Sequence, residues 1–267
     1  YRVFGNPIAQ SKSPFIHQKF AEQTEQTLNY QSELVELDKF DQAVNTLIAN
    51  SGKGANVTAP FKEQAFALCD ELSERAKLAG AVNTLIFSKG AIYGDTTDGV
   101  GLVSDLLRHK IKLRDSNILL LGAGGAAKGV VQSLLEQSPL SLTIANRTLS
   151  TAQTIAHQYP NADIKAVTFA NTENSIFDII INATSAGLSG DSLAISDQTI
   201  KKSSTCYDMV YGKAPTAFLI QAKQLGVANI IDGLGMLVGQ AGASFQLWTG
   251  IKPDVDPVLQ SLREQLK

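Results

Sequence analysis

Lys62 and Asp98 are the two side chains of this sequence best suited to proton chemistry. Lys62 closes the segment NVTAPFK (56–62), just after an expected strand, and Asp98 lies in GDTTDG (94–99), just before an expected helix. A lysine ammonium can donate a proton to an oxygen that gains negative charge, and a neighbouring carboxylate can orient that ammonium. Burial disfavours a charged lysine while a carboxylate favours it, and we expect the protonated form. The ordinary alternatives are a solvated lysine and an aspartate N-cap.

Two serines could bind a carboxylate near the amino terminus. In SKSP (11–14), Pro14 suits the first position of a helix and Ser13 the N-cap. Ser11 and Ser13 would then place two hydroxyls beside the positive end of a helix, which favours an anion without any arginine. The alternative is simple helix capping.

Thr58 and Asn83 add polar groups to the same part of the chain. Thr58 ends the strand expected in GANVTA (54–59), and Asn83 begins another in AVNTL (81–85), where it could also be a turn residue. Ligands of open α/β sheets bind where strands end. Hydroxyls, an amide, an ammonium and a carboxylate together would suit a polyhydroxylated acid.

The segment NILLLGAGGAAKG (117–129) predicts a dinucleotide site. An apolar strand passes into a turn with Gly122, Gly124 and Gly125 and then into a helix, whose first N–H groups and positive dipole end can hold a diphosphate. The pattern is G-x-G-G-x-A rather than the usual G-x-G-x-x-G, and a turn that is glycine-rich for packing reasons is the alternative.

Arg147 favours NADP over NAD. SLTIANR (141–147) has the position of the next strand of a βαβ unit, at whose end such folds contact the adenosine ribose. An acidic residue there would bind the 2′-hydroxyl of NAD, whereas a guanidinium suits a 2′-phosphate. A surface arginine, with Thr148 as an ordinary helix N-cap, is the alternative.

Composition indicates a metabolic enzyme in a reducing compartment. The 267 residues carry a net charge of −2 and no basic block, which argues against nucleic acid or an anionic membrane as partner. Cys69 and Cys206 have no metal or disulfide spacing, so we expect a cytoplasmic protein without a metal site. No apolar stretch has transmembrane length, and no signal peptide is apparent. Because the sequence begins with Tyr1, we expect a few residues before it.

Strands and helices alternate along the chain, which predicts mainly parallel sheets covered by helices. The expected helices include 13–23, 41–50, 97–110 and 235–250, and a seam between two modules falls near 98–115. The expected strands are 1–5, 28–37, 54–59, 82–88, 117–122, 141–146, 177–184, 204–211 and 228–233.

The sequence as a whole resembles the shikimate dehydrogenase family. The resemblance rests, in chain order, on FGNPIAQSKSP, GANVTAPFK, AGAVNTL, GDTTDG, LGAGGAAKG, ANRT, NATSAG and IDGLGMLVGQA. It implies reversible reduction of 3-dehydroshikimate to shikimate with NADPH. We expect a monomer or homodimer, a choice that the sequence does not decide. The resemblance also implies two α/β domains: a substrate-binding domain of residues 1–98 plus 235–267 with a mainly parallel sheet, and a Rossmann-like dinucleotide-binding domain of residues 99–234.

The resemblance also assigns site residues. The shikimate contacts that it implies are Ser11, Ser13, Thr58, Lys62, Asn83, Asp98, Tyr211 and Gln240, with Lys62 and Asp98 as the catalytic pair. The cofactor contacts that it implies are Gly122, Ala123, Gly124, Gly125, Ala126, Asn146, Arg147, Thr148, Met209 and Gly233, with Glu74 as a further candidate. Tyr211 could instead be a core tyrosine, Met209 a packing residue and Gln240 a surface glutamine.

One departure from the family concerns cofactor choice. Many members carry a second basic residue shortly after NRT, where this sequence has Thr151, so the preference for NADP could rest mainly on Arg147. Two alternatives remain at this point: a quinate/shikimate dehydrogenase with broader use of substrates and of NAD or NADP, and a catalytically silent ligand sensor on the same fold. The presence of both Lys62 and Asp98 argues against the sensor.

Overall fold

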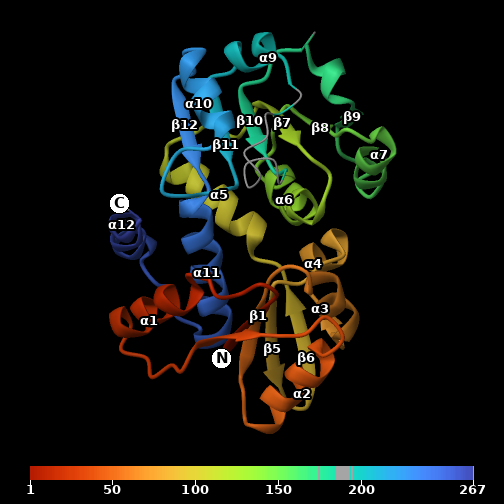
Figure 1. Cartoon of the computed structure of the whole chain (residues 1–267). Coiled ribbons are helices and arrows are strands. Elements are labelled where there is room, and N and C mark those ends of the chain that lie inside the picture. The colour runs from red at the N-terminus through yellow and green to blue at the C-terminus, as the bar shows by residue number, and fades with distance from the viewer. Residues whose placement is uncertain (174, 185–192, 194, 267) are drawn as a thin grey trace. The chain divides into compact units, whose positions relative to one another are not determined.

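The computed structural model describes residues 1–173, 175–184, 193 and 195–266. Its internal contacts divide the chain into two compact units. The first unit consists of Tyr1–Gly101 and Leu237–Gln265, and Leu102–Met236 makes up the body of the second. Each unit is built around one six-stranded sheet (Figure 1). No helix in the described part of the chain is long and apolar enough to cross a membrane.

The first sheet is mixed, with one reversed strand near its centre. The strand order is β2-β1-β3-β5-β6-β4, and β5 is antiparallel to both β3 and β6 while the other pairs are parallel. The strands are β1 (Arg2–Gly5), β2 (Gln31–Leu34), β3 (Gly54–Val57), β4 (Glu71–Leu72), β5 (Thr84–Ser88) and β6 (Ala91–Asp95). The predicted mainly parallel sheet is therefore confirmed, with β5 as its one reversed strand. The short connection between β5 and β6 can join only antiparallel strands, so these two strands run in opposite directions.

Helices cover both faces of this sheet because successive strand residues point to opposite sides. In β1, Phe4 packs with α2 and α3, whereas Val3 faces the side of Tyr30 and Trp248. The helices of this unit are α1 (Ser13–Gln23), α2 (Phe40–Ala49), α3 (Lys62–Leu68), α4 (Glu74–Ala79), α12 (Val255–Gln265) and most of α11 (Leu234–Thr249). The helix α5 (Asp98–Arg108) begins in this unit and continues into the second.

A buried histidine of α1, His17, packs against α11. The ring of His17 stacks on Tyr30 at a centroid distance of 4.2 Å and lies 5.2 Å from the ring of Trp248. His17 Nε2 lies 3.1 Å from Asn56 Oδ1, which as an amide oxygen can only accept, so Nε2 carries the proton. The other ring nitrogen, Nδ1, is buried without a hydrogen-bond partner among the described residues. Burial lowers the pKa of His17 to about 3, against the smaller opposing effect of the Asn56 hydrogen bond.

The second sheet is entirely parallel and has the strand order of a dinucleotide-binding fold. Its order is β12-β11-β10-β7-β8-β9, so the chain reverses direction across the sheet between β7 and β10. The strands are β7 (Asn117–Leu121), β8 (Ser141–Ala145), β9 (Ile164–Val167), β10 (Ile179–Asn182), β11 (Thr205–Asp208) and β12 (Asn229–Asp232). The Rossmann-like architecture predicted for this part of the chain is confirmed.

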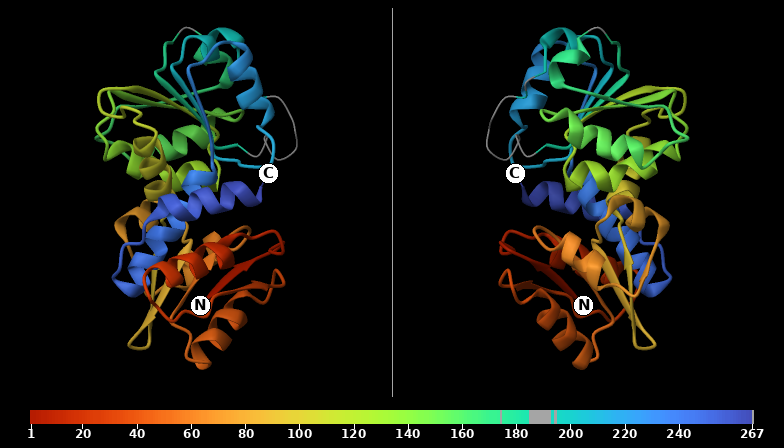
Figure 2. Two further views of the ribbon diagram at one scale, coloured as in Figure 1. Left: turned by 90° about the vertical axis from the view of Figure 1, so that its left-hand side faces the viewer. Right: turned by 90° about the vertical axis from the view of Figure 1, so that its right-hand side faces the viewer.

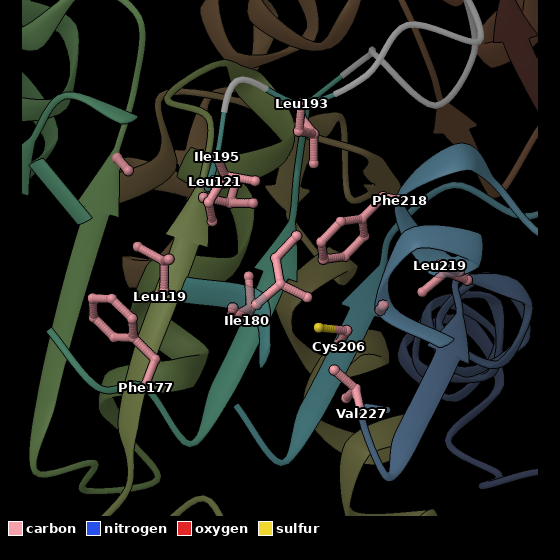
Figure 3. Close-up of a cluster of buried hydrophobic side chains, with 13 residues drawn as sticks. Leu119, Leu121, Phe177, Ile180, Leu193, Ile195, Cys206, Phe218, Leu219 and Val227 are labelled. Carbon is pink, nitrogen blue, oxygen red and sulfur yellow. The ribbon is translucent and has the colours of Figure 1, made fainter. Parts of the chain in front are cut away.

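Helices flank both faces of the second sheet (Figure 2). On one face, Leu119, Ile180 and Cys206 from three neighbouring strands pack against Phe218 and Leu219 of α10 (Figure 3). On the other face, the buried Tyr207 hydroxyl donates to Asp105 Oδ2 of α5 at 2.7 Å. The helices are α6 (Gly125–Leu135), α7 (Leu149–His157), η1 (Phe169–Thr172), α9 (Asp197–Lys201) and α10 (Ala217–Gln224).

Three strands that the sequence analysis did not assign, β4, β6 and β9, are short or half-exposed. β4 has two residues, β6 contains Gly94 in its interior, and β9 is an edge strand with one exposed residue and no buried one. None of them shows the alternation or the apolar run that identifies a strand. At the other edge, the strand expected over residues 28–37 is confined to Gln31–Leu34.

We expect His17 to make stability depend on pH. The unfolded chain protonates this side chain below about pH 6.5, whereas the folded chain resists protonation down to about pH 3. Its contribution is therefore complete above the unfolded pKa and is lost as the pH falls through this window. Between pH 7 and pH 5 the wild type should lose about 2 kcal/mol more of its free energy of unfolding than the His17→Gln variant.

Urea denaturation at the two pH values measures this difference. The exposed His157 provides the control, since His157→Gln should retain the pH dependence of the wild type. An equal loss of stability in wild type and His17→Gln would contradict the assignment.

Candidate active site

The reversed strand β5 brings the polar segments of the first unit together at one end of its strands, where β3 and β6 finish. We call this the carboxyl-terminal edge of the sheet. Because β5 is antiparallel to its neighbours, its amino end lies beside the carboxyl ends of β3 and β6. Thr84 pairs with Asn56 on one side and with Asp95 on the other. Asn83 directly precedes β5, while Lys62 and Asp98 follow β3 and β6 within a few residues.

Lys62 and Asp98 form an ion pair at this edge. Lys62 Nζ lies 2.5 Å from Asp98 Oδ2, and the side chains are 28% and 12% exposed, respectively. Lys62 begins α3 and Asp98 begins α5, so two helix starts fix the positions of the two charges. The partial exposure leaves the ammonium accessible to a ligand. The alternative of a solvated lysine without a partner is wrong.

The side-chain amide of Asn83 binds the second oxygen of the Asp98 carboxylate. The backbone N–H of Thr97 fixes the orientation of this amide. The Thr97 N–H donates to Asn83 Oδ1 at 2.9 Å, and a backbone N–H cannot become an acceptor. The Asn83 amino group therefore faces the other way and donates to Asp98 Oδ1 at 2.8 Å. Asp98 thus accepts hydrogen bonds at both oxygens, from Asn83 and from Lys62.

Gln240 of α11 also lies beside Asn83 and Thr97, although it is far from them in the sequence. Its Oε1 lies 3.4 Å from both Asn83 Nδ2 and Thr97 Oγ1, and its amino group donates to the Leu237 carbonyl within α11. The alternative of a helix-surface glutamine is wrong, because Gln240 is half-buried beside the carboxylate-binding amide.

The two serines lie at the start of α1, one position later in the helix than expected. Lys12 occupies the N-cap, Ser13 is the first helical residue and Pro14 the second. Ser13 is buried, Ser11 is half-buried, and Ser11 Oγ accepts from the Ser13 N–H at 3.3 Å. The expected role of Ser13 as N-cap is therefore wrong, because Lys12 occupies that position, where it makes no side-chain capping bond.

Thr58 stands where β3 leaves the sheet. Its N–H donates to the Phe4 carbonyl at 2.9 Å, and the residue is half-buried. Glu74, by contrast, is exposed at the start of α4 and accepts from Lys77 Nζ at 2.6 Å.

Sequence reasoning missed a layer of buried polar side chains behind Asn83. Ser244 of α11 is fully buried, and its Oγ lies 2.8 Å from Thr84 Oγ1 and 3.0 Å from Asn56 Nδ2. Thr84 in turn donates to Asn83 Oδ1 at 2.7 Å. Asn56 and Thr84 lie within segments that were assigned as strands, and no sequence signal marks Ser244. Their convergence depends on the packing of α11 against the sheet.

The glycine-rich turn of the second unit lies at the point where the strand order reverses. Gly122 has a φ of 102°, and a side chain there would meet Thr184 and Ala183, which follow β10. Gly124 is the N-cap of α6, and nothing lies within 4 Å of a Cβ built on Gly124 or Gly125. Both glycines and Ala126 are exposed, while Ala123 is buried. This open backbone at a helix start fits a diphosphate.

Arg147 is an exposed cation at the end of β8. It has no hydrogen-bond or ion-pair partner among the residues described in the structure. Asn146 Nδ2 donates to the Thr148 carbonyl at 2.9 Å, which closes the turn. Thr148 is the N-cap of α7, as the alternative predicts, but its side chain makes no capping hydrogen bond. The guanidinium of Arg147 and the hydroxyl of Thr148 are thus both available to bind a phosphate group.

Met209, Tyr211 and Gly233 lie at the carboxyl ends of β11 and β12. The Met209 N–H donates to the Asn182 carbonyl at 3.0 Å, and a Cβ on Gly233 would lie 2.1 Å from the Met209 carbonyl oxygen. Gly233 therefore permits a close approach of the two backbones. Tyr211 is half-buried rather than a core residue, and burial raises the pKa of its hydroxyl.

A buried carboxylate at this edge was also missed. Asp208 is fully buried and accepts from Asn182 Nδ2 and Thr216 Oγ1. Of the quoted NATSAG segment, residues 185–187 lie outside the described residues. In the described part of the chain, no group of three His, Cys, Asp or Glu side chains could hold a metal ion.

Family models match most of the chain. The shikimate dehydrogenase substrate-binding domain matches residues 3–85, shikimate/quinate 5-dehydrogenase matches residues 105–203, and the shikimate 5′-dehydrogenase C-terminal domain matches residues 233–263.

Individual proteins agree with these models. A shikimate dehydrogenase (NADP(+)) of Colwellia psychrerythraea is 55% identical over 100% of this chain and 97% of its own length. Among solved structures, an Ael1 enzyme from Pseudomonas putida has a TM-score of 0.95 at 40% identity, covering 98% of this chain and 97% of its own. The shikimate 5-dehydrogenase of Thermus thermophilus, solved with NADP(H) and shikimate, has a TM-score of 0.89 at 30% identity, covering 99% and 98%. The chain therefore belongs to the shikimate dehydrogenase family.

Proposed function

We propose that this protein catalyses the reversible NADPH-dependent reduction of 3-dehydroshikimate to shikimate, in the route to chorismate and the aromatic amino acids. The observation that carries the proposal is the Lys62–Asp98 pair, accessible at a sheet edge and joined there by Asn83. The relatives that share the whole length of the chain are named for this activity.

In this proposal, the first unit binds the substrate. The hydroxyls of Ser11 and Ser13, at the start of α1, hold its carboxylate. Thr58, Asn83 and Gln240 offer hydroxyl and amide groups to the ring hydroxyls. We accordingly assign residues 1–98 and 235–267, which nearly coincide with the first unit, to the substrate-binding domain, and residues 99–234 to the NADP-binding domain.

Lys62 is the general acid of the reduction. As hydride reaches the C3 carbonyl carbon, negative charge grows on the carbonyl oxygen, and the Lys62 ammonium donates a proton to it. In the oxidation, the neutral amine accepts the proton of the C3 hydroxyl. Asp98 holds the ammonium at 2.5 Å and binds the same substrate hydroxyl, while Asn83 keeps the carboxylate in place.

The second unit holds the cofactor, which supplies the hydride when bound. The open backbone from Gly122 to Ala126 receives the diphosphate, and Asn146, Arg147 and Thr148 receive the adenosine ribose with its 2′-phosphate. Met209 and Gly233 follow β11 and β12 directly, at the carboxyl ends of these strands, and contribute further cofactor contacts. Glu74 is a weaker candidate, because it is paired with Lys77.

A cytoplasmic location belongs to the same proposal. Cys69 and Cys206 are both free thiols, and burial raises their pKa values to about 12 and about 11, respectively. Thiols held in the protonated form are inert, which suits a reducing compartment.

A broader quinate/shikimate dehydrogenase is the second candidate, because the model that matches residues 105–203 covers both substrates. We expect the protein to reduce NADP⁺ in the presence of shikimate and to use quinate or NAD⁺ much less efficiently. The absorbance of the reduced nicotinamide, measured for all four combinations, tests this. Efficient turnover of quinate with NAD⁺ would favour the broader enzyme. Tight shikimate binding without turnover would favour the sensor.

Substitution of Lys62 tests the proton transfer. Lys62→Ala should lower kcat by about 10²- to 10⁴-fold. Lys62→Arg keeps the positive charge beside Asp98 but does not release a proton near neutral pH, and it should be nearly as slow. Both variants should still be stabilised by shikimate in thermal unfolding. Lys19→Ala, which removes the surface pair with Glu22, serves as the control with unchanged kcat. Wild-type turnover in Lys62→Ala would refute the assignment.

Substitution of Arg147 tests the cofactor preference. A charge-assisted contact is worth about 1.5–3 kcal/mol, so Arg147→Ala should raise KM for NADPH by about 10- to 100-fold. KM for NADH should change little, because NADH has no 2′-phosphate. Arg114→Ala, an exposed arginine that precedes β7 at the opposite end of the strands, is the matched control. Equal weakening of both cofactors would show that Arg147 does not contact the 2′-phosphate.

A further inference from the structure

Asp95 is a buried carboxylate in the same segment as Asp98, and the proposed proton transfer does not use it. It is the last residue of β6, and its side chain is 3% exposed. Arg75 of α4 binds both of its oxygens: Nε lies 2.7 Å from Oδ1, and Nη2 lies 2.6 Å from Oδ2. Such a two-point contact between a guanidinium and a carboxylate is strong and specific in geometry. The Asp95 side chain is therefore held in one orientation.

Ser73 binds the same carboxylate from the start of α4. It is the N-cap of this helix, where its Oγ accepts from the Ala76 N–H at 3.2 Å. Its hydroxyl proton is directed to the sheet instead and is donated to Asp95 Oδ1 at 2.5 Å. The helix α4 therefore contributes both a capping hydroxyl and a guanidinium to the position of one side chain.

The Asp95 side chain directs the turn that leads from β6 into α5. Its Oδ1 accepts from the N–H of Thr96 at 2.7 Å, and Thr96 is buried. The next residue, Thr97, is fully buried and donates its N–H to Asn83 Oδ1 at 2.9 Å. Two successive backbone N–H groups thus have fixed acceptors before the helix begins at Asp98.

The backbone of Asp95 also holds Asn83. The Asp95 carbonyl accepts from the Asn83 N–H at 3.0 Å, and the Asn83 amino group in turn donates to Asp98 Oδ1. Asp95 therefore acts on the Asp98 carboxylate from two sides: its carbonyl fixes the residue that binds the carboxylate, and its side chain fixes the backbone that carries it. All of these residues belong to the first unit.

We propose that Asp95 is a positioning residue for the Asp98 carboxylate, an inference that rests on the proposed function. Its side chain acts through the Thr96 N–H and the turn into α5, and it needs no contact of its own with substrate or cofactor. Because Asp98 holds the Lys62 ammonium, loss of this acceptor should misplace the proton donor and leave NADP⁺ binding intact.

Asp95→Ala is the first test, because it leaves the buried Thr96 N–H without its acceptor. Since misplacement of a catalytic group is costly, kcat for shikimate oxidation should fall about tenfold. KM for NADP⁺ should change by less than about threefold, because the glycine-rich turn and Arg147 belong to the second unit. The absorbance of the reduced nicotinamide measures both values.

Asp70→Ala is the matched control for this variant. The Asp70 carboxylate also accepts from a backbone N–H of β6, that of Ile92 at 2.8 Å, but near the start of the strand rather than at its end. Its loss should leave the turn into α5 in place, and kcat should remain that of the wild type.

A second pair of variants decides the matter should Asp95→Ala fail to fold. Replacement of a buried ion pair by uncharged side chains of similar volume is often tolerated, so both are made in the Arg75→Met background. Asparagine and leucine have nearly the same shape, but only asparagine offers an oxygen to the Thr96 N–H. In this background Asp95→Asn should keep kcat within about threefold of the wild type, whereas Asp95→Leu should lower it about tenfold.

A double-mutant cycle with Asp98→Asn separates positioning from general destabilisation. Residues that act through one another are not additive, so Asp95→Ala should lower kcat by less than about threefold in the Asp98→Asn background. The loss of thermal stability caused by Asp95→Ala should persist in both backgrounds.

The outcomes distinguish this inference from the proposed function. An inactive wild type would overturn both. An active wild type whose kcat is unchanged by Asp95→Ala would overturn the inference alone, as would equal kcat values of the asparagine and leucine variants. Full additivity with Asp98→Asn, or a rise in KM for NADP⁺ as large as the fall in kcat, would also overturn it.

Discussion

The direction of one strand determines the chemistry available to the first unit. In a uniformly parallel sheet, Asn83 at the amino end of β5 would lie at the opposite edge from Lys62 and Asp98. The short β5–β6 hairpin reverses β5, so Asn83 lies at their edge and binds the carboxylate that also holds the lysine. The resulting site joins an ammonium, a carboxylate and an amide. The ammonium and the carboxylate beside it are thereby in place without a bound substrate, which is the arrangement that the proposed general acid catalysis requires.

Rigidity at this edge comes from buried polar groups rather than from the apolar core. Ser244, Thr84 and Asn56 form a connected set of hydrogen bonds behind Asn83, and Asn56 continues it to Tyr30 and His17. A buried polar group is costly unless it is satisfied, so a nearly fully paired network favours one arrangement over all others. Among the described residues, the one unpaired buried side-chain atom, His17 Nδ1, lies at the end of the network remote from the Lys62–Asp98 pair. The same network anchors α11, which carries Gln240.

The second unit differs from the first, because the diphosphate of a dinucleotide is bound by exposed backbone N–H groups rather than by charged side chains. Gly124 and Gly125 leave open space at the start of α6, and Arg147 offers the charge that a 2′-phosphate requires. Close backbone contacts, Gly122 beside Thr184 and Gly233 beside Met209, hold the loops that follow the strands. Asp208 adds a side-chain contact to this backbone arrangement, since it accepts from both Val210 and Thr216.

The amino-acid sequence by itself determined the two α/β modules, the glycine-rich turn and the pairing of Lys62 with Asp98, and it predicts Arg147 as a cofactor residue. These rest on local signals: apolar runs, clustered glycines, and charged residues beside strand ends. Only the tertiary structure placed Gln240, Ser244 and Asn56 near the Lys62–Asp98 pair and joined Asp208 to both Val210 and Thr216. Their roles depend on contacts between residues distant in the chain or on hydrogen-bond directions within a loop. Neither has a periodicity or a motif, because a polar side chain looks the same in a sequence whether it is buried and bonded or exposed to water.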